Sequence, residues 1–89
     1  MNDILYATAE FGETTRQFLE SEVGRYLKGR AEAEALEYTE QLKTVDPDDA
    51  KKIRDLQNGI YRAESVVQWL IEAIEEGDEA INTFIEETD

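Results

Sequence analysis

The chain has 89 residues, 40% of them apolar and 9% aromatic, which is enough for the modest core of one small domain. It has neither cysteine nor histidine, which excludes disulfides, thiolate metal sites and imidazole bases. The formal net charge of -13 makes nucleic acid and anionic lipid poor partners, because phosphate binding requires lysine and arginine, and favours a basic protein surface instead.

The first segment, residues 1–20, is predicted to be an N-terminal helix or arm. Its apolar and threonine residues recur at spacings of four and three, the period of one helix face. They are Ile4, Thr8, Phe11, Thr15 and Phe18. Gly12 weakens this helix, so a segment that is ordered by a partner stays open as an alternative. Ser21 is a candidate cap for the helix that follows.

Two long helices are predicted next, over residues 21–45 and 46–76. In the first, the residues with helical spacing are Leu27, Ala31, Ala35, Tyr38 and Leu42. In the second, they form an unbroken heptad pattern of Ile53, Leu56, Ile60, Ala63, Val67, Leu70 and Ile74. Helices joined by a tight turn pack antiparallel, so this pattern predicts a long helical hairpin with Ala35 near Ile60.

Two local signals bear on the second long helix. Asp46 is predicted to cap it, with Pro47 as its first residue, because proline lacks only an N–H group that a helix start leaves unpaired. A calcium loop is disfavoured, because its glycine and glutamate positions hold Lys51 and Gln57. The Asn58-Gly59 pair, a common turn signal, falls inside the heptad pattern, so the helix is predicted to continue. Gly59 either permits close approach of a neighbouring backbone or, as we favour, is merely tolerated.

The last segment, residues 77–89, is predicted to be an acidic helix or tail after a break at Gly77 and Asp78. Residues 72–89 hold eight acidic residues and no basic one. The predicted acidic surface consists of Glu72, Glu75, Glu76, Asp78 and Glu79. The fold class that follows is all-α, a long antiparallel hairpin within a small bundle of three or four helices that forms a single domain, residues 1–89.

A second stripe on the second long helix is the candidate partner-binding surface. Its members lie beside the heptad seam and include the one tryptophan. They are Tyr61, Arg62, Val66, Trp69 and Ala73. Trp69 has two interpretations, of which we favour burial under the N-terminal helix through Phe11 and Phe18. The other is an anchor for a partner protein or a second copy, because Trp, Tyr and Arg dominate interface hot spots.

Catalysis is not predicted. The chain has no histidine for a Ser-His-Asp triad and no cysteine for thiol chemistry. Carboxylate clusters on helices are usually solvated surfaces rather than metal sites. We therefore expect no enzyme activity, cofactor, bound metal or small-molecule substrate.

Six short motifs, taken together, suggest a family. They are GRYL at 24–27, RAE at 30–32, VDP at 45–47, LQN at 56–58, RAES at 62–65 and WL at 69–70. Over residues 19–79 the chain resembles small uncharacterised proteins of tailed bacteriophages and prophages. The resemblance implies a viral protein that acts in virion assembly or against a host protein, and it supplies no family active site.

Two functions of different classes are consistent with these features. The first is a non-catalytic protein-protein interaction protein of phage origin, a hairpin module that binds a phage structural protein, a host protein or a second copy of itself. The second is an acidic inhibitor that mimics DNA and occupies the basic groove of a host nucleic-acid-binding or defence protein. No apolar run reaches the roughly 20 residues that span a bilayer, and no signal peptide is recognisable. The expected location is the cytoplasm of the host bacterium or the virion.

Overall fold

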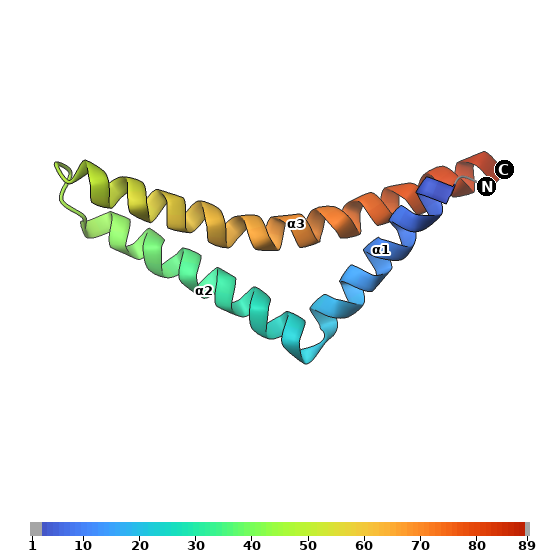
Figure 1. Ribbon diagram of the computed structural model, residues 1–89, viewed down its shortest axis with the longest axis horizontal. Coiled ribbons are helices and arrows are strands. Elements are labelled where there is room, and N and C mark those ends of the chain that lie inside the picture. Colours follow the sequence, from blue (N-terminus) through green and yellow to red (C-terminus); the bar gives the residue numbers. More distant parts are fainter. Residues whose placement is uncertain (1–2, 89) are drawn as a thin grey trace. The chain divides into compact units, whose positions relative to one another are not determined.

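Three helices, α1 (Asp3–Glu20), α2 (Glu22–Thr44) and α3 (Ala50–Thr88), make up the computed structural model, which describes residues 3–88 (Figure 1). They account for 93% of the described residues, which include no strand. The predicted all-α class is therefore confirmed. The contacts divide the chain into two units. We call residues 26–68 the central unit, and residues 3–25 with 69–88 the terminal unit.

A single residue, Ser21, joins α1 to α2 and caps the start of α2. Its hydroxyl donates a hydrogen bond to the carbonyl oxygen of Phe18 and accepts one, at 3.1 Å, from the backbone N–H of Gly24. The predicted cap at Ser21 is thus present. Gly24 is required by this tight turn, because a Cβ there would lie 1.7 Å from the Phe18 carbonyl oxygen.

The start of α3 differs from the prediction. The Asp46 carbonyl accepts a hydrogen bond from the Asp49 backbone N–H at 2.9 Å, so residues 46–49 form a β-turn with Pro47 at its second position. Asp49 then caps the helix, because its carboxylate accepts a hydrogen bond from the Lys52 backbone N–H at 3.0 Å. The helix begins at Ala50, and the prediction that Asp46 caps it was wrong because the turn uses that residue first.

The predicted break at Gly77 was also wrong, because α3 continues without interruption to Thr88. The sequence suggested a break because glycine and aspartate often end helices. In the structure Gly77 is buried where α1 meets α3, and this packing explains a glycine inside the helix.

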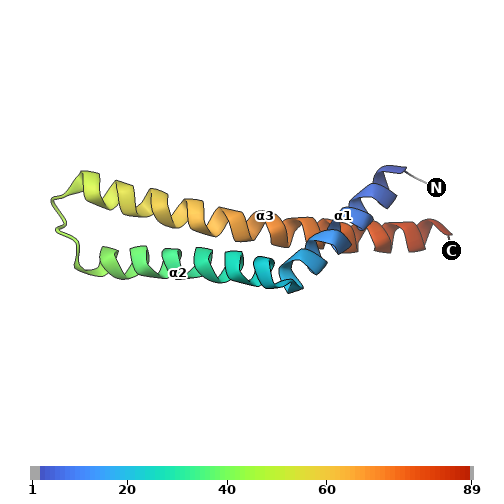
Figure 2. The same ribbon diagram turned by 60° about the horizontal axis from the view of Figure 1, so that its bottom comes forward.

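In the central unit, α2 runs beside the first half of α3 (Figures 1 and 2). Buried Ala35, Leu56 and Ala63 form its core. Ala31 and Ala35 face Ala63 across a shallow groove. The residues of the predicted seam from Ile53 to Val67 are buried or half-buried, whereas Leu27, also assigned to the seam, is 43% exposed.

Gly59 has a packing role, which was the less favoured of its two interpretations from the sequence. It is buried, and a Cβ there would lie 2.7 Å from Cε2 and 2.8 Å from Cδ2 of the Tyr38 ring. The glycine therefore makes room for the aromatic ring of α2, and the prediction that it is merely tolerated was wrong.

This contact predicts a reversal of sign between two backgrounds. In the wild-type chain, Gly59→Ala should be destabilising, because the methyl group forces the Tyr38 ring aside. In a Tyr38→Ala background the ring is gone, so Gly59→Ala should raise the free energy of unfolding by about 1 kcal/mol through helix propensity alone. Urea unfolding of the four variants measures both effects. An equal effect of Gly59→Ala in both backgrounds would contradict the assignment.

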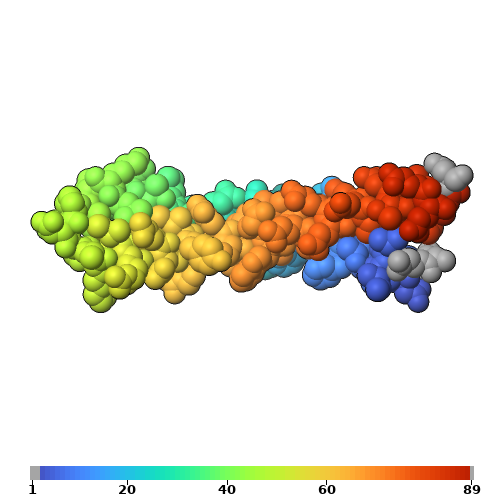
Figure 3. All heavy atoms as spheres, turned by 90° about the horizontal axis from the view of Figure 1, so that it is seen from above, coloured from blue at the N-terminus to red at the C-terminus, as the bar shows by residue number. Residues whose placement is uncertain are grey.

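In the terminal unit, α1 lies beside the C-terminal part of α3 (Figure 3). The two helices meet through small residues. Gly12 and Gly77 meet backbone to backbone, since a Cβ on either would lie 2.8 Å from the Cα of the other. Thr15 and Ala80 are each 5% exposed, and the Thr15 hydroxyl donates to the Phe11 carbonyl oxygen at 2.8 Å. Glycine allows this close approach of the two helices.

Candidate functional site

The five residues of the predicted partner-binding surface all lie on α3, but they belong to different units. Tyr61, Arg62 and Val66 are in the central unit, and Trp69 and Ala73 are in the terminal unit. Each group is described within its own unit.

The central-unit group is exposed, as a binding surface requires. Tyr61 is 74% exposed, and Val66 is 45% exposed. Tyr61 and Arg62 line a shallow depression of about 460 Å³ together with Asp55 and Asn58. This depression offers an aromatic ring, a guanidinium, an amide and a carboxylate, which suits polar contacts with another protein.

The carboxylate of the depression is already paired. Asp55 accepts a hydrogen bond from Lys51 Nζ at 2.8 Å, and this bond lowers the pKa of the Asp55 carboxyl below its ordinary value. A lowered pKa in the folded state means that the pair stabilises the fold above the ordinary pKa of aspartate. That contribution is lost as the pH falls through the lowered pKa. Both groups are on the surface, so the pair contributes little to stability.

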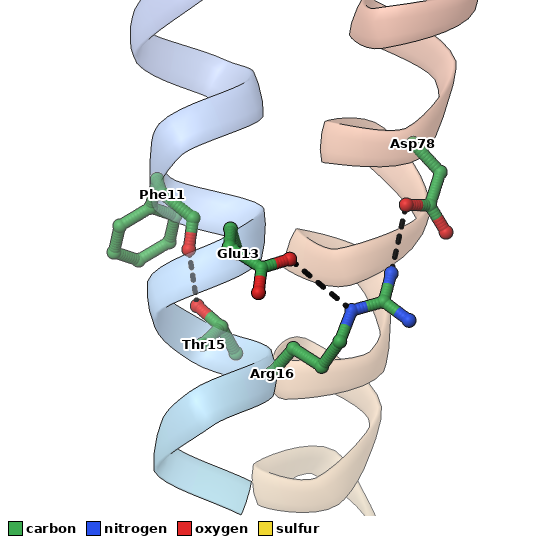
Figure 4. Close-up of polar contacts among 5 residues, drawn as sticks. All are labelled: Phe11, Glu13, Thr15, Arg16 and Asp78. Carbon is green, nitrogen blue, oxygen red and sulfur yellow. Dashed lines mark hydrogen bonds and ion pairs between the residues drawn. The ribbon is translucent and has the colours of Figure 1, made fainter.

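Trp69 is exposed, contrary to the interpretation that we favoured. Its exposed fraction is 66%, and that of Phe11 is 64%. The Phe11 ring points away from α3 (Figure 4), so it does not cover the indole. The physical reason is the glycine contact, because α1 turns its small residues toward α3 at Gly12 and leaves its aromatic residues outside.

Ala73 does not share the exposure of Trp69. It is half-buried, and its carbonyl oxygen lies 2.9 Å from the position that a Cβ on Gly12 would occupy. The backbone of Ala73 therefore takes part in the packing between α1 and α3, and its place on the partner-binding surface stays a prediction.

The acidic residues Glu72, Glu75, Glu76, Asp78 and Glu79 are all exposed on α3. Asp78 Oδ1 accepts a hydrogen bond from Arg16 Nη2 at 2.8 Å, and Arg16 Nε lies 3.6 Å from Glu13 Oε2 (Figure 4). Within residues 3–88 no group of three or more acidic side chains is arranged to hold a metal ion.

The structure reveals a further site that the sequence interpretation missed. It is an apolar groove of about 170 Å³ between α1 and α3. Its lining residues are Leu5, Tyr6 and Ala9 of α1 and Ala80, Ile81 and Phe84 of α3. The sequence showed that Ile81 and Phe84 lie on an amphipathic segment, but it did not show which helix they face. Leu5, Tyr6 and Ala9 lie outside the stripe that drew attention to α1, and only their contact with α3 makes them part of a site.

The negative charge is concentrated in the terminal unit. Its described residues hold twelve acidic residues and two arginines, a net charge of -10, whereas the central unit holds nine acidic and seven basic residues, a net charge of -2. Asp89, outside the described residues, supplies the remaining charge. The folded chain thus adds the carboxylates of α1 to the acidic region that the sequence placed at residues 72–89 alone.

This concentration predicts that salt stabilises the protein. The five residues of the acidic surface form five like-charge pairs at spacings of three and four along α3, each destabilising by roughly 0.2–0.5 kcal/mol at low salt. Raising NaCl from low concentration to a few hundred millimolar should screen them and raise the free energy of unfolding by about 1 kcal/mol. Urea unfolding measures this change without adding ions. A flat response would contradict the prediction.

Comparison with known proteins gives no relative: no family model, curated protein or solved structure matches this chain. Among the described helices, none is long and apolar enough to cross a membrane.

Proposed function

We propose that this is a non-catalytic protein-protein interaction protein of phage origin that acts in assembly. Its binding module is the helical hairpin of α2 and α3. Tyr61 in the central unit and Trp69 in the terminal unit are each an anchor. The observation that carries the proposal is the poor burial of large apolar side chains. Only Ala35, Leu56, Ala63 and Ala80 are buried hydrophobic residues in the described part of the chain, whereas thirteen large apolar or aromatic residues are exposed.

Exposed apolar area on this scale favours a binding function over a self-sufficient globular one. A partner that covers such side chains removes apolar surface from water, which favours association. Tyrosine, tryptophan and arginine are the residues that contribute most to hot spots, and Tyr61, Arg62 and Trp69 are all exposed. The partner would be a phage structural protein or a host protein.

The phage origin and the role in assembly come from the resemblance of residues 19–79 to small phage proteins. The absence of cysteine and histidine from the sequence favours binding over catalysis. The host cytoplasm or the virion is the proposed location.

A pull-down from lysate of the infected host with matched variants tests the proposal. Tyr61→Ala and Trp69→Ala should each weaken capture of the partner at least tenfold, because a hot-spot truncation removes a fully desolvated contact. Tyr26→Ala is the control, since Tyr26 is 61% exposed on α2 and is not part of the predicted surface. Circular dichroism should show unchanged helicity in all three. Equal capture by Tyr26→Ala and Tyr61→Ala would contradict the proposal.

A second candidate function is favoured by the net charge of -10 on the terminal unit. An inhibitor that mimics DNA would present these carboxylates to the basic groove of a host nucleic-acid-binding or defence protein. Neutralising Glu72, Glu75, Glu76, Asp78 and Glu79 to Gln or Asn should then abolish capture, and duplex DNA should displace the bound partner. In the assembly role the same change should mainly slow association, because charges at the rim steer encounter.

A further inference from the structure

The apolar groove of the terminal unit has neither Tyr61 nor Trp69 among its lining residues. One turn of α1, with Leu5, Tyr6 and Ala9, forms one wall, and one turn of α3, with Ala80, Ile81 and Phe84, forms the other. Tyr6 is 58% exposed and Ile81 is 42% exposed, so both present apolar surface to water at the groove.

The size of the groove indicates the kind of ligand. Pockets for small molecules have volumes of about 300–1,000 Å³, and this groove, at about 170 Å³, is smaller. It matches one or two apolar side chains that project from a larger partner. A peptide or protein segment that inserts an apolar residue fits it better than a free metabolite.

The charge around the groove indicates the sign of the charge that a partner should carry. Asp3, Glu10 and Glu87 are exposed, and each lies three or four positions along its helix from Tyr6 or Phe84, so it is on the same side of the helix as a lining residue. The nearest base along α1 is Arg16, which is paired with Asp78 and Glu13. A second copy of the chain would bring the same net charge of -10 to the groove, so charge complementarity disfavours self-association and favours a basic partner.

The groove lies between two helices, which is the geometry that accepts the apolar face of an amphipathic helix. We propose that it binds a basic amphipathic helix of a partner protein, with an apolar residue in the groove and lysine or arginine residues toward the surrounding carboxylates. This inference deepens the proposed interaction function by naming a partner class, but it involves different residues, so the two are tested separately.

Three labelled peptides with the full-length chain test the inference by fluorescence anisotropy. The first is an 18-residue peptide of leucine and lysine with its leucines on one helix face. The second has the same composition with the leucines scattered around the helix, and the third carries glutamate in place of lysine. We expect the first peptide to bind at least fivefold more tightly than the second, and the third to show no binding. Equal affinity for the first two would mean attraction by charge alone and would overturn the proposal.

Two matched pairs of variants locate the site. Ile81→Ala removes a lining residue, and Ile85→Ala removes an isoleucine of the same helix that is 50% exposed and does not line the groove. Tyr6→Ala and the non-lining Phe11→Ala form the corresponding pair on α1. We expect Ile81→Ala and Tyr6→Ala to weaken binding of the first peptide about fivefold or more, and their controls to change it less than twofold. Equal losses within either pair would overturn the proposed location.

The central-unit residues distinguish this inference from the proposed function. Tyr61→Ala should leave peptide affinity unchanged, because Tyr61 does not line the groove. A loss of peptide binding in Tyr61→Ala would overturn the assignment to the groove. The proposed function fails independently if Tyr61→Ala and Trp69→Ala capture as much partner as the wild-type chain does.

Discussion

Gly12→Ala and Gly77→Ala are expected to destabilise the terminal unit, although each replaces glycine with the best helix former. The added Cβ would lie 2.8 Å from the Cα of the opposite glycine, and at Gly12 it would also lie 2.9 Å from the Ala73 carbonyl oxygen. Backbone atoms cannot rotate aside as a side chain can, so the two helices must move apart. Overpacking of this kind costs about 1–3 kcal/mol, and it opposes the gain of about 1 kcal/mol from helix propensity.

Gly29→Ala is the control for these variants. Gly29 lies in α2, and apart from its chain neighbours and the nearby backbone of its own helix, no described heavy atom lies within 4 Å of the position of its added Cβ. This substitution should therefore raise the free energy of unfolding by about 1 kcal/mol. Urea unfolding followed by circular dichroism measures the three variants. If Gly12→Ala stabilises the chain as much as Gly29→Ala does, the close packing of α1 on α3 is wrong.

Ala35→Glu should have the largest effect in the central unit. Ala35 is only 9% exposed and faces the alanine of α3 at position 63. A glutamate there carries its charge into the space between the helices without a basic partner, which costs on the order of several kcal/mol. Small domains have a total stability of only about 5–15 kcal/mol, so much of the chain population should unfold.

Glu37→Ala provides the comparison for Ala35→Glu. Glu37 is exposed on the same helix, and changes at such positions usually alter stability by about 0.5 kcal/mol or less. Thermal unfolding should therefore show a large fall in the melting temperature for Ala35→Glu and almost none for Glu37→Ala. Equal melting temperatures would remove Ala35 from the core.

The helix signals of the sequence were mostly local, and so were their errors. Asp46, Pro47 and Asp49 all suit a helix start, and the hydrogen bonds show that the first two form a turn while the third caps the helix. Gly59 and Gly77 were interpreted from propensity alone, as tolerated or as a break. Gly59 instead makes room for the Tyr38 ring, and Gly77 contacts the backbone of α1 at Gly12. Helix propensity describes neither contact.

The exposure of the residues on the candidate surface was predicted in part. The exposed positions of Tyr61, Arg62 and Val66 agree with a stripe beside the seam. Trp69 and Ala73 were placed on that same stripe, but one is exposed and the other packs against α1. Helical spacing gives the direction of a side chain around its own helix, and it does not say where a neighbouring helix ends.

The sequence by itself determined that the chain is helical, that it contains neither histidine nor cysteine, and that it carries a formal net charge of -13. These properties follow from composition and from the period of apolar residues, both of which are local. Only the tertiary structure decided that Gly12 meets Gly77, that Arg16 pairs with a carboxylate 62 positions away, and that α1 joins the acidic end of α3. The reason is that contacts between distant segments depend on how closely two backbones can approach. The fit between two helix surfaces cannot be inferred from the residue periodicity of either helix alone.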